Sequence, residues 1–321
     1  MSEPTTSHTG RARSGHATSD PRRRTSLLRR VRRGWGKNVG WLFVIPALLM
    51  YAFFVLLPLV LSVQYSFVRW NGIGPMTWVG LKNYADIVTI PDLLGTVFNA
   101  FKLIVFFSVI PVSVGLVVAA IMHRVARGRF GAVARTILFL PQVIPLVAAG
   151  IIWGWLLSRT GLINQILNGI GLNDFTRAWL GDFDWALPAV GFVGTWVLLG
   201  LCTVLLLTGM TKIEPALYES ARIDGAGWFN EFFGITIPLM RQEIGVCLTV
   251  TVIAALATFD IVYVTTGGGP GHSTAVPGIQ IYILAFTERR IGLASALAVM
   301  LMLLVLVVIL PIQRLTRDTS R

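Results

Sequence analysis

Six long apolar stretches set the tightest limit on what this chain can fold into. A helix needs about 20 consecutive apolar residues to cross the hydrocarbon core of a membrane. Because that core offers no water to the backbone, each stretch must satisfy its own polar groups as a helix. The sequence therefore predicts an all-α membrane protein with six transmembrane helices, at residues 40–63, 97–122, 134–157, 186–210, 244–264 and 292–312.

Charge is scarce in this chain and unevenly placed. Only 13% of the 321 residues are charged, which is about half the usual share in a soluble domain. The net charge is +12, and residues 1–38 supply +8 of it, with ten Lys or Arg against Glu3 and Asp20. We expect residues 1–38 to be a disordered basic cytoplasmic tail, 39–315 the transmembrane domain, and 316–321 a cytoplasmic C-terminal end. A basic run beside the first span suits anionic lipid better than nucleic acid.

The distribution of basic residues between the short loops predicts which way the helices run. Loops on the cytoplasmic side carry an excess of Lys and Arg. With the N-terminus inside, the inside segments hold 20 Lys or Arg and the outside segments hold six. Both termini are therefore expected in the cytoplasm. The six outside residues are Arg69, Lys82, Arg159, Arg177, Arg289 and Arg290.

The outer segments between the spans carry their own patterns. Residues 161–172 place apolar side chains at helical spacing, which predicts an amphipathic helix on the outer membrane surface. Trp179 and Trp185 fit an aromatic belt at the membrane interface. Residues 276–287 are too short and too polar to span, so we expect an interfacial or re-entrant segment there.

The sequence lacks the residue patterns that enzyme chemistry needs. Cys202 and Cys247 lie singly in apolar stretches, without disulfide or zinc spacing. Neither G-x-x-x-x-G-K-[ST] nor H-E-x-x-H occurs, and the glycine-rich turn 267–271 lacks the lysine of a phosphate loop. The four histidines lie in the tail, at a helix end or in a loop, so none is placed as the base of an intramembrane protease. We therefore expect no catalytic residue, no metal site and no cofactor bound by this chain.

Residues 211–243, on the predicted cytoplasmic side, are too patterned for a simple loop. Glu214-Pro215 indicates a helix start, and Asp224-Gly225 indicates its end, since glycine tolerates a left-handed backbone. A second short helix is expected from Trp228 to Gly234, and Pro238 is expected to break the chain before the fifth span. This elbow exposes apolar and aromatic side chains, which suits either a groove on a partner protein or the lipid interface.

The spacing within the elbow resembles the EAA loop of binding-protein-dependent ABC importer permeases. Glu219-Ser220-Ala221, three residues, Gly225, nine residues, Ile235, one residue and Ile237-Pro238 follow the family pattern E-A-A-x3-G-x9-I-x-L-P. Ser220 and Ile237 are mild departures from it. Asp224, Ala226, Phe232 and the segment 266–271 resemble the MalF-like, carbohydrate-uptake branch of the family. Further matching segments are 80–84, 161–164 and 292–296, with Tyr282 and Phe286 before the last span.

This resemblance implies a type I ABC importer permease fold over about residues 40–315, in the bacterial cytoplasmic (inner) membrane. The elbow, residues 211–240, would be the coupling loop, seated in a groove of a cytoplasmic ATPase. Glu219 and Asp224 would make polar contacts there, Gly225 would permit the tight turn, and Ala221 would allow close approach. The full set of expected ATPase-coupling residues is Glu219, Ser220, Ala221, Asp224, Gly225, Ala226, Phe232 and Pro238.

The resemblance also implies partners for this chain. They are a second homologous permease subunit, an ATPase dimer that carries ATP and Mg, and an extracytoplasmic solute-binding (lipo)protein. The substrate would be an oligosaccharide, a disaccharide or a related polyol. A self-sufficient secondary transporter of small solutes is the alternative, and it would need ionisable groups that face the interior of the bundle.

Apart from Arg135, at the inner end of the third span and counted with the inside segments, the predicted spans hold only two charged residues, Lys102 and Asp260. Lys102 is near a span end and can extend its charge to the outer interface. Asp260 is expected to face a polar cavity or a partner helix, since an uncompensated carboxylate inside a membrane is costly. With a single cation in the spans, a neutral sugar is favoured over a phosphate ester. The expected substrate pathway combines hydrogen-bonding groups with aromatic rings, and comprises Thr195, Trp196, Phe259, Asp260 and Tyr263.

Overall fold

The computed structural model describes residues 41, 43–125 and 128–316. The expected basic tail 1–38 and residues 317–321 of the expected C-terminal end therefore lie outside the described residues. The chain divides into two units after Leu59. The described part of the first unit is helical from Phe43, with a π-helical turn η1 (Ala52–Leu56) that leads into α2 (Leu57–Tyr65). Its side chains from Phe43 to Leu59 are exposed, as expected of a helix that meets lipid.

Within residues 43–125 and 128–316, four unbroken helices are long and apolar enough to cross a membrane. They are Phe43–Tyr65, Pro91–Val125, α9 (Ala186–Met210) and α16 (Ile291–Thr316). The second of them is assembled from α4 (Pro91–Ile104), the π turn η2 (Val105–Val109) and α5 (Ile110–Val125). Two further pairs of helices meet at sharp bends, so the number of spans is six if each bent pair counts as one.

The third predicted span is not one straight helix, which corrects the expectation for residues 134–157. It consists of α6 (Gly128–Val143) and α7 (Leu146–Leu156), which meet at an angle of 94°. Pro145 precedes α7 with an extended ψ of 136°. Because proline disfavours helical backbone in the residue before it, the helix ends ahead of this point and restarts after it.

The fifth predicted span, residues 244–264, is also interrupted. The helix α13 (Arg241–Leu256) stops before the turn 257–259, and the short helix α14 (Asp260–Thr265) follows. Phe259 has φ −139° and ψ −58°, which lies outside helical backbone and accounts for the interruption.

The expected break at Pro238 is displaced. The helical run continues from α11 (Trp228–Glu231) through the π turn η4 (Phe232–Thr236) into α12 (Ile237–Leu239), so the second elbow helix extends well beyond Gly234. A π turn interrupts the regular i→i−4 hydrogen-bond ladder, and a proline directly after it fits without ending the helix. The bend of 71° comes after Leu239 instead.

The remaining elements lie in the connections. The first connection holds a two-stranded antiparallel hairpin and a short helix, and the third holds α8, which agrees with the amphipathic helix expected at 161–172. The short apolar helix Pro277–Thr287 is too short to span, as the sequence predicts. These elements are β1 (Val68–Arg69), β2 (Thr77–Trp78), α3 (Lys82–Thr89), α8 (Leu162–Gly169), η3 (Asn173–Phe175), α10 (Pro215–Ile223), α15 (Pro277–Tyr282) and η5 (Ile283–Thr287).

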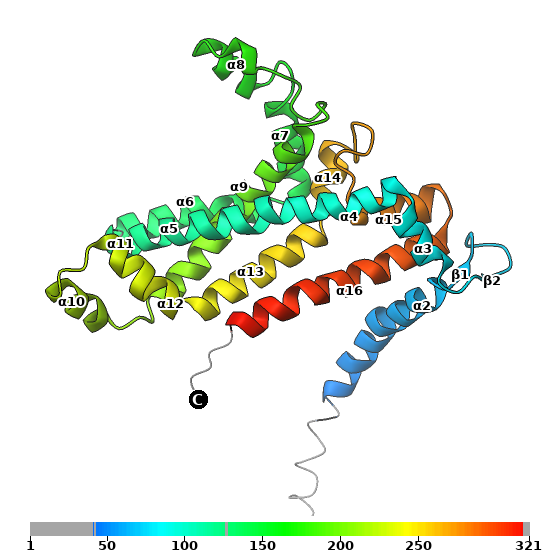
Figure 1. The fold of residues 1–321 in the computed structure, drawn as a ribbon, viewed down its shortest axis with the longest axis horizontal. Coiled ribbons are helices and arrows are strands. Elements are labelled where there is room, and N and C mark those ends of the chain that lie inside the picture. The colour runs from blue at the N-terminus through cyan, green and yellow to red at the C-terminus, as the bar shows by residue number, and fades with distance from the viewer. Residues whose placement is uncertain (1–40, 42, 126–127, 317–321) are drawn as a thin grey trace, which may run out of the picture. The chain divides into compact units, whose positions relative to one another are not determined.

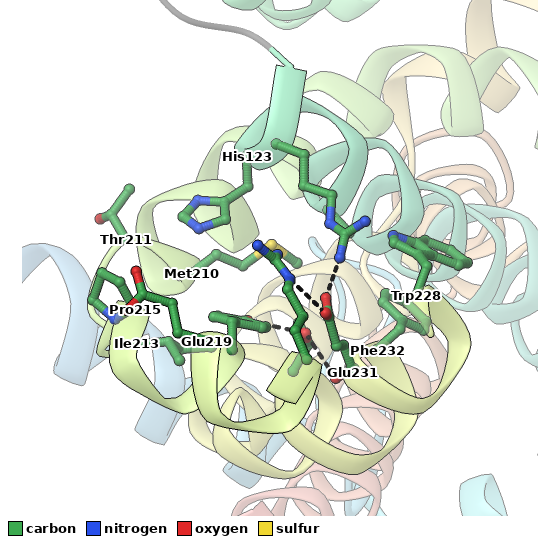
Figure 2. Close-up of a pocket in the computed structure, with 14 residues that line it drawn as sticks. His123, Met210, Thr211, Ile213, Pro215, Glu219, Trp228, Glu231 and Phe232 are labelled. Atoms are coloured by element: carbon green, nitrogen blue, oxygen red, sulfur yellow. Dashed lines mark hydrogen bonds and ion pairs between the residues drawn. The ribbon is translucent and has the colours of Figure 1, made fainter. Parts of the chain in front are cut away.

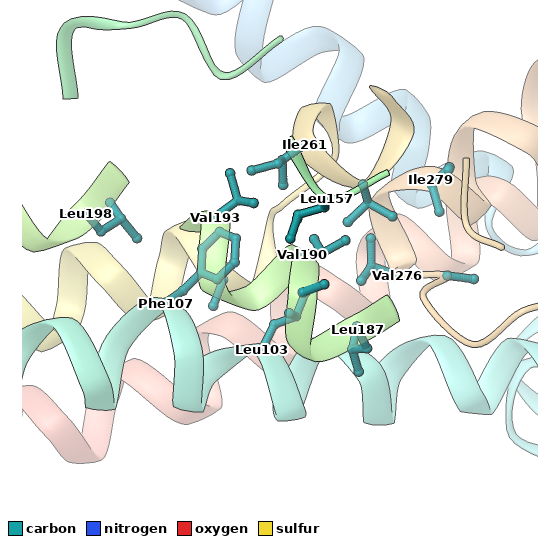
Figure 3. Packing of buried hydrophobic residues seen from close by; sticks show 14 residues of the cluster. Leu103, Phe107, Leu157, Leu187, Val190, Val193, Leu198, Ile261, Val276 and Ile279 are labelled. Carbon is teal, nitrogen blue, oxygen red and sulfur yellow. The ribbon is translucent and has the colours of Figure 1, made fainter. Parts of the chain in front are cut away.

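The helix α9 is the centre of the packing in the second unit. It lies beside α5 and α6, and the three ribbons run together in Figure 1. Toward the predicted outer side, its residues Val190 and Val193 pack with Leu103, Phe107 and Ile261, as Figure 3 shows. Toward the predicted cytoplasmic side, a second cluster joins α9 to α5 and to the elbow, through residues that include Leu116, Leu206, Met210, Phe232 and Met240.

Small residues let α9 approach its neighbours closely, as is usual between membrane helices. A Cβ on Gly200 would lie 1.8 Å from the carbonyl oxygen of Leu138 in α6. A Cβ on Gly194 would lie 2.1 Å from the ring of Phe107. The first clash involves backbone, which cannot rotate away, so Gly200 fixes the distance between α6 and α9.

We predict that Gly200→Ala destabilises the protein by about 1–3 kcal/mol, because the added methyl overpacks this contact. The control is Gly154→Ala in α7, where a Cβ would meet no atom within 4 Å. Thermal unfolding of both variants in detergent checks this. Equal melting temperatures for Gly200→Ala and the control would contradict the packing described here.

Candidate functional site

The first helix of the elbow, α10, ends in a turn that needs glycine. Gly225 has φ +83°, in the left-handed region, and nothing lies within 4 Å of where its Cβ would be. The Ala226 N–H donates to the Ala221 carbonyl at 2.9 Å, and the Gly225 N–H donates to the Arg222 carbonyl at 3.1 Å. These bonds satisfy carbonyls that the end of a helix leaves free. The sequence predicts this turn from Asp224-Gly225, and the structure has it.

The residues with the family spacing do not all lie on one surface. Those of α10 and its turn are exposed or half-buried. Phe232 is buried, and its ring stacks on Trp228 with centroids 5.1 Å apart. Pro238 is exposed on α12, a separate element. The structure therefore brings together Glu219, Ser220, Ala221, Asp224, Gly225 and Ala226, and it places Phe232 and Pro238 apart from them.

Exposed apolar side chains accompany the polar ones on the elbow. Ile223, at the end of α10, is 86% exposed, and Leu217 lies two turns before it. Phe229 and Phe233 project from α11 and η4 and are also exposed. A surface of this kind, with apolar side chains flanked by Glu219 and Asp224, is typical of a site that meets another molecule.

A buried carboxylate, which the sequence analysis missed, ties the elbow to the end of α5. Glu231 is 4% exposed and lies between two guanidinium groups. Arg222 Nε of α10 donates to Glu231 Oε1 at 2.8 Å, and Arg124 Nη2 of α5 donates to Oε2. Figure 2 shows both interactions as dashed lines. Because of its bond to the Glu231 carboxylate, the pKa of Arg222 lies above its ordinary value.

A cavity of about 590 Å³ lies beside this ion-pair network, between the elbow and the C-terminal ends of α5 and α9. Within the elbow, the hydroxyls of Tyr218 of α10 and Thr236 of η4, which also line the cavity, form a hydrogen bond of 3.0 Å. Polar contacts around this cavity therefore add to the apolar cluster that joins the elbow to α5 and α9. Other residues that line the cavity include Ala120, His123, Met210, Ile213, Glu219 and Phe232.

The expected substrate-pathway residues of the fifth span lie in a chain of aromatic rings. Phe259 and Tyr263 are stacked, with centroids 5.2 Å apart, and Tyr282 contacts both rings. Phe286 extends the series from η5, 5.3 Å from Tyr282. Asp260 is exposed at the first residue of α14, beside this series, and has no ion-pair partner in the described part of the chain. Tyr282 was noted in the sequence only as part of the family pattern.

The residues expected in the fourth span differ from each other in what they can offer a ligand. The Thr195 hydroxyl donates to the carbonyls of Phe106 and Gly191, so it is already used within the protein. Trp196 is half-buried, and its ring meets Trp153 of α7 edge-on at 5.5 Å. Phe192 completes this aromatic group, 5.2 Å from Trp153. Since α7 also packs on α14, it carries the link between the fourth and fifth spans.

The described residues hold no group of three or more His, Cys, Asp or Glu that could bind a metal ion. Both cysteines are buried as free thiols. The exposed side chains of the elbow suit contact with a protein, and the aromatic groups suit contact with a ligand.

Comparisons with known proteins place the chain among transporters. Residues 111–321 match the family described as "Binding-protein-dependent transport system inner membrane component". The probable ABC transporter permease protein YurN of Bacillus subtilis is 35% identical over 268 residues, which cover 83% of this chain and 91% of that protein. The trehalose/maltose transport system permease protein MalF of Thermococcus litoralis is 33% identical, over 88% of this chain and 95% of that protein.

Two further similarities concern carbohydrates. The diacetylchitobiose uptake system permease protein NgcF of Streptomyces coelicolor is 32% identical, over 79% of this chain and 75% of that protein. A chain in the crystal structure of a bacterial ABC transporter that imports the acidic polysaccharide alginate has a TM-score of 0.77. It is 22% identical and covers 91% of this chain and 100% of that chain, so it shows a shared fold.

We predict that Glu231→Gln loosens the attachment of α10. Two guanidinium groups then lose the charge between them, at a cost of about 1–2 kcal/mol, moderated because both are partly exposed. Hydrogen exchange of the amides at 215–226 should become faster. The control is Glu243→Gln, which breaks the more exposed Lys212–Glu243 pair (3.0 Å) and leaves the network around Glu231 intact. The same exchange rates in both variants would show that Glu231 does not hold α10.

Proposed function

The chain belongs to the binding-protein-dependent transport system inner membrane component family of ABC transporters, and we propose that it is one of two permease subunits of an ATP-driven carbohydrate importer. It is a multi-pass protein of the inner membrane. In the proposed importer it forms half of the translocation pathway. ATP and Mg are held by a separate ATPase, because the chain carries no phosphate-loop motif of its own.

The observation that carries this proposal is the exposed elbow. A helix-in-groove contact needs exposed apolar anchors, and α10 presents Leu217 near its start and Ile223 at its end. Glu219 and Asp224 flank them with carboxylates that can pair with cations on a partner. The half-buried Ala221 leaves room for close approach. We therefore assign α10 and its turn as the part that sits in the ATPase groove.

Coupling requires that movement of the elbow reaches the transmembrane helices. Glu231 supports this role, because its two ion pairs connect α10 to α5 through α11. The Tyr218–Thr236 hydrogen bond adds a second connection between α10 and η4. Closure of the ATPase dimer would push on α10, and these links would carry the push to α5. The result is a rigid-body switch between inward-facing and outward-facing states.

The aromatic groups support a sugar as the transported solute. Ligand sites combine apolar and aromatic walls with a few polar groups that fix orientation. The Phe259–Tyr263–Tyr282 series beside Asp260, and the Trp153–Trp196 pair, offer that combination on neighbouring elements. Relatives named for trehalose, maltose and diacetylchitobiose point to neutral or amide-bearing sugars. An extracytoplasmic solute-binding protein would deliver the sugar, as the family name implies.

We predict that Gly225→Leu abolishes uptake while the protein stays in the membrane. The backbone of residue 225 has φ +83°, so a side chain there strains the turn and also blocks the approach of the ATPase. Gly227→Ala is the control, since Gly227 has an ordinary φ of −79° and nothing within 4 Å. Uptake of labelled maltose, trehalose and diacetylchitobiose by cells that carry each variant, with membrane abundance from blotting, checks this. Normal uptake by Gly225→Leu would contradict the assignment of α10 and its turn to the ATPase groove.

The substrate pathway makes a separate prediction. Trp196→Leu should raise the KM for uptake about three- to tenfold, because the sugar loses its contact with one aromatic ring. Trp155→Leu serves as the control, because Trp155 lies on the same helix as Trp153 but is 75% exposed. Concentration-dependent uptake measures both KM values. If Trp196→Leu and Trp155→Leu have the same KM for uptake, Trp196 does not line the pathway.

A further inference from the structure

Four basic side chains gather at one pocket on the predicted outer side. The pocket has a volume of about 470 Å³, and Arg69, Lys82, Arg289 and Arg290 line it. Arg69 and Lys82 come from the first connection, whereas Arg289 and Arg290 directly precede α16. The fold therefore brings together two pairs of cations that are far apart in the sequence.

This gathering runs against the distribution of charge in the rest of the chain. Lys and Arg are depleted on the outer side of membrane proteins, and only six are expected there in this sequence. Four of those six line the same pocket. The other two, Arg159 and Arg177, belong to the connection that holds α8. Such a concentration indicates a site for negative charge.

The pocket keeps most of its positive charge unneutralised. Asp86 is the one acidic residue among the described residues that line the pocket. Outside the lining, Glu288 Oε2 lies 3.6 Å from Arg290 Nη1. In the described part of the chain, Arg69, Lys82 and Arg289 have no ion-pair partner. Arg289 also has φ +55°, a left-handed backbone that arginine rarely adopts and that is typical of functional positions.

The ends of the flanking membrane helices put the pocket at the depth expected for lipid headgroups. The first membrane helix ends at Tyr65, four positions before Arg69, and α16 begins at Ile291, directly after Arg290. The ends of spanning helices mark the boundary between hydrocarbon and headgroups. The hairpin beside the pocket exposes Ile73, Met76 and Trp78, as a segment in contact with the membrane interface would.

We propose that this pocket binds the phosphate group of an anionic phospholipid. Guanidinium groups form paired hydrogen bonds with phosphate, and three arginines line the pocket. The acyl chains would enter the hydrocarbon below, alongside the ends of the flanking helices. An acidic surface of a soluble partner would also meet these charges, but it would not use a pocket at headgroup depth with exposed apolar neighbours. The site is independent of the transported solute.

Native mass spectrometry of the full-length chain in detergent tests this proposal. Phosphatidylglycerol and phosphatidylcholine of the same chain length are titrated against the wild type and two double variants. Arg69→Gln/Arg289→Gln removes two pocket charges, and Arg159→Gln/Arg177→Gln removes two outer charges away from it. We expect one retained phosphatidylglycerol in the wild type and the control, and binding weakened about tenfold or more in the pocket variant.

Several results would overturn the assignment. Equal retention of the two lipids by the wild type, or equal loss in both double variants, would mean that no lipid site exists here. Displacement of the lipid by inorganic phosphate at similar concentration would identify a free-phosphate site instead. A pocket variant that keeps phosphatidylglycerol but no longer binds its solute-binding protein would identify a docking surface. If the pocket variant has a lower melting temperature than the control, Lys82→Gln alone is titrated, with weaker lipid binding expected.

Discussion

The absence of water from the membrane core governs this structure, because every backbone polar group there must find a partner within the protein. Unbroken helices meet that requirement directly. Where helices are interrupted, shorter-range bonds form: the Ile144 N–H donates to the Pro141 carbonyl at 3.2 Å, and the Thr258 N–H donates to the Ala255 carbonyl at 3.4 Å. Close packing at Gly200 then holds the broken third span against α9. The interruption in the fifth span, in turn, sets Asp260 at the start of a new helix beside three aromatic rings.

The same constraint explains where polar chemistry lies in the chain. Charged groups that cannot be carried inside the spans gather at their ends, and each gathering has a distinct structure. The one on the predicted cytoplasmic side is a buried carboxylate between two arginines, which joins the elbow to α5. The one on the predicted outer side is a pocket of mostly unpaired cations beside α16. The first suits the transmission of movement within the protein, and the second suits attachment to the surrounding membrane.

The sequence predicts the features that depend on neighbouring residues. Apolar length locates the membrane helices, and Asp224-Gly225 predicts a left-handed turn because few other pairs favour one. The sequence does not predict features that depend on contacts between residues far apart in the chain. Glu231 pairs with Arg124, 107 positions away, and no local pattern marks that contact. Proline alone does not predict where a helix ends. A helix ends before Pro145, but the chain stays helical through Pro238, because a π turn precedes Pro238. The roles of the elbow and pathway residues remain predictions.

The central claim is that this chain works as one permease within an ATP-driven assembly. Native mass spectrometry of the chain, purified in mild detergent from its own host, tests it most directly. The account predicts a complex that contains a second, homologous permease and two copies of an ATPase. Recovery of the chain alone, or only with copies of itself, across several mild detergents would contradict the account. The elbow would then be a helix on the membrane surface, and the chain a self-sufficient carrier.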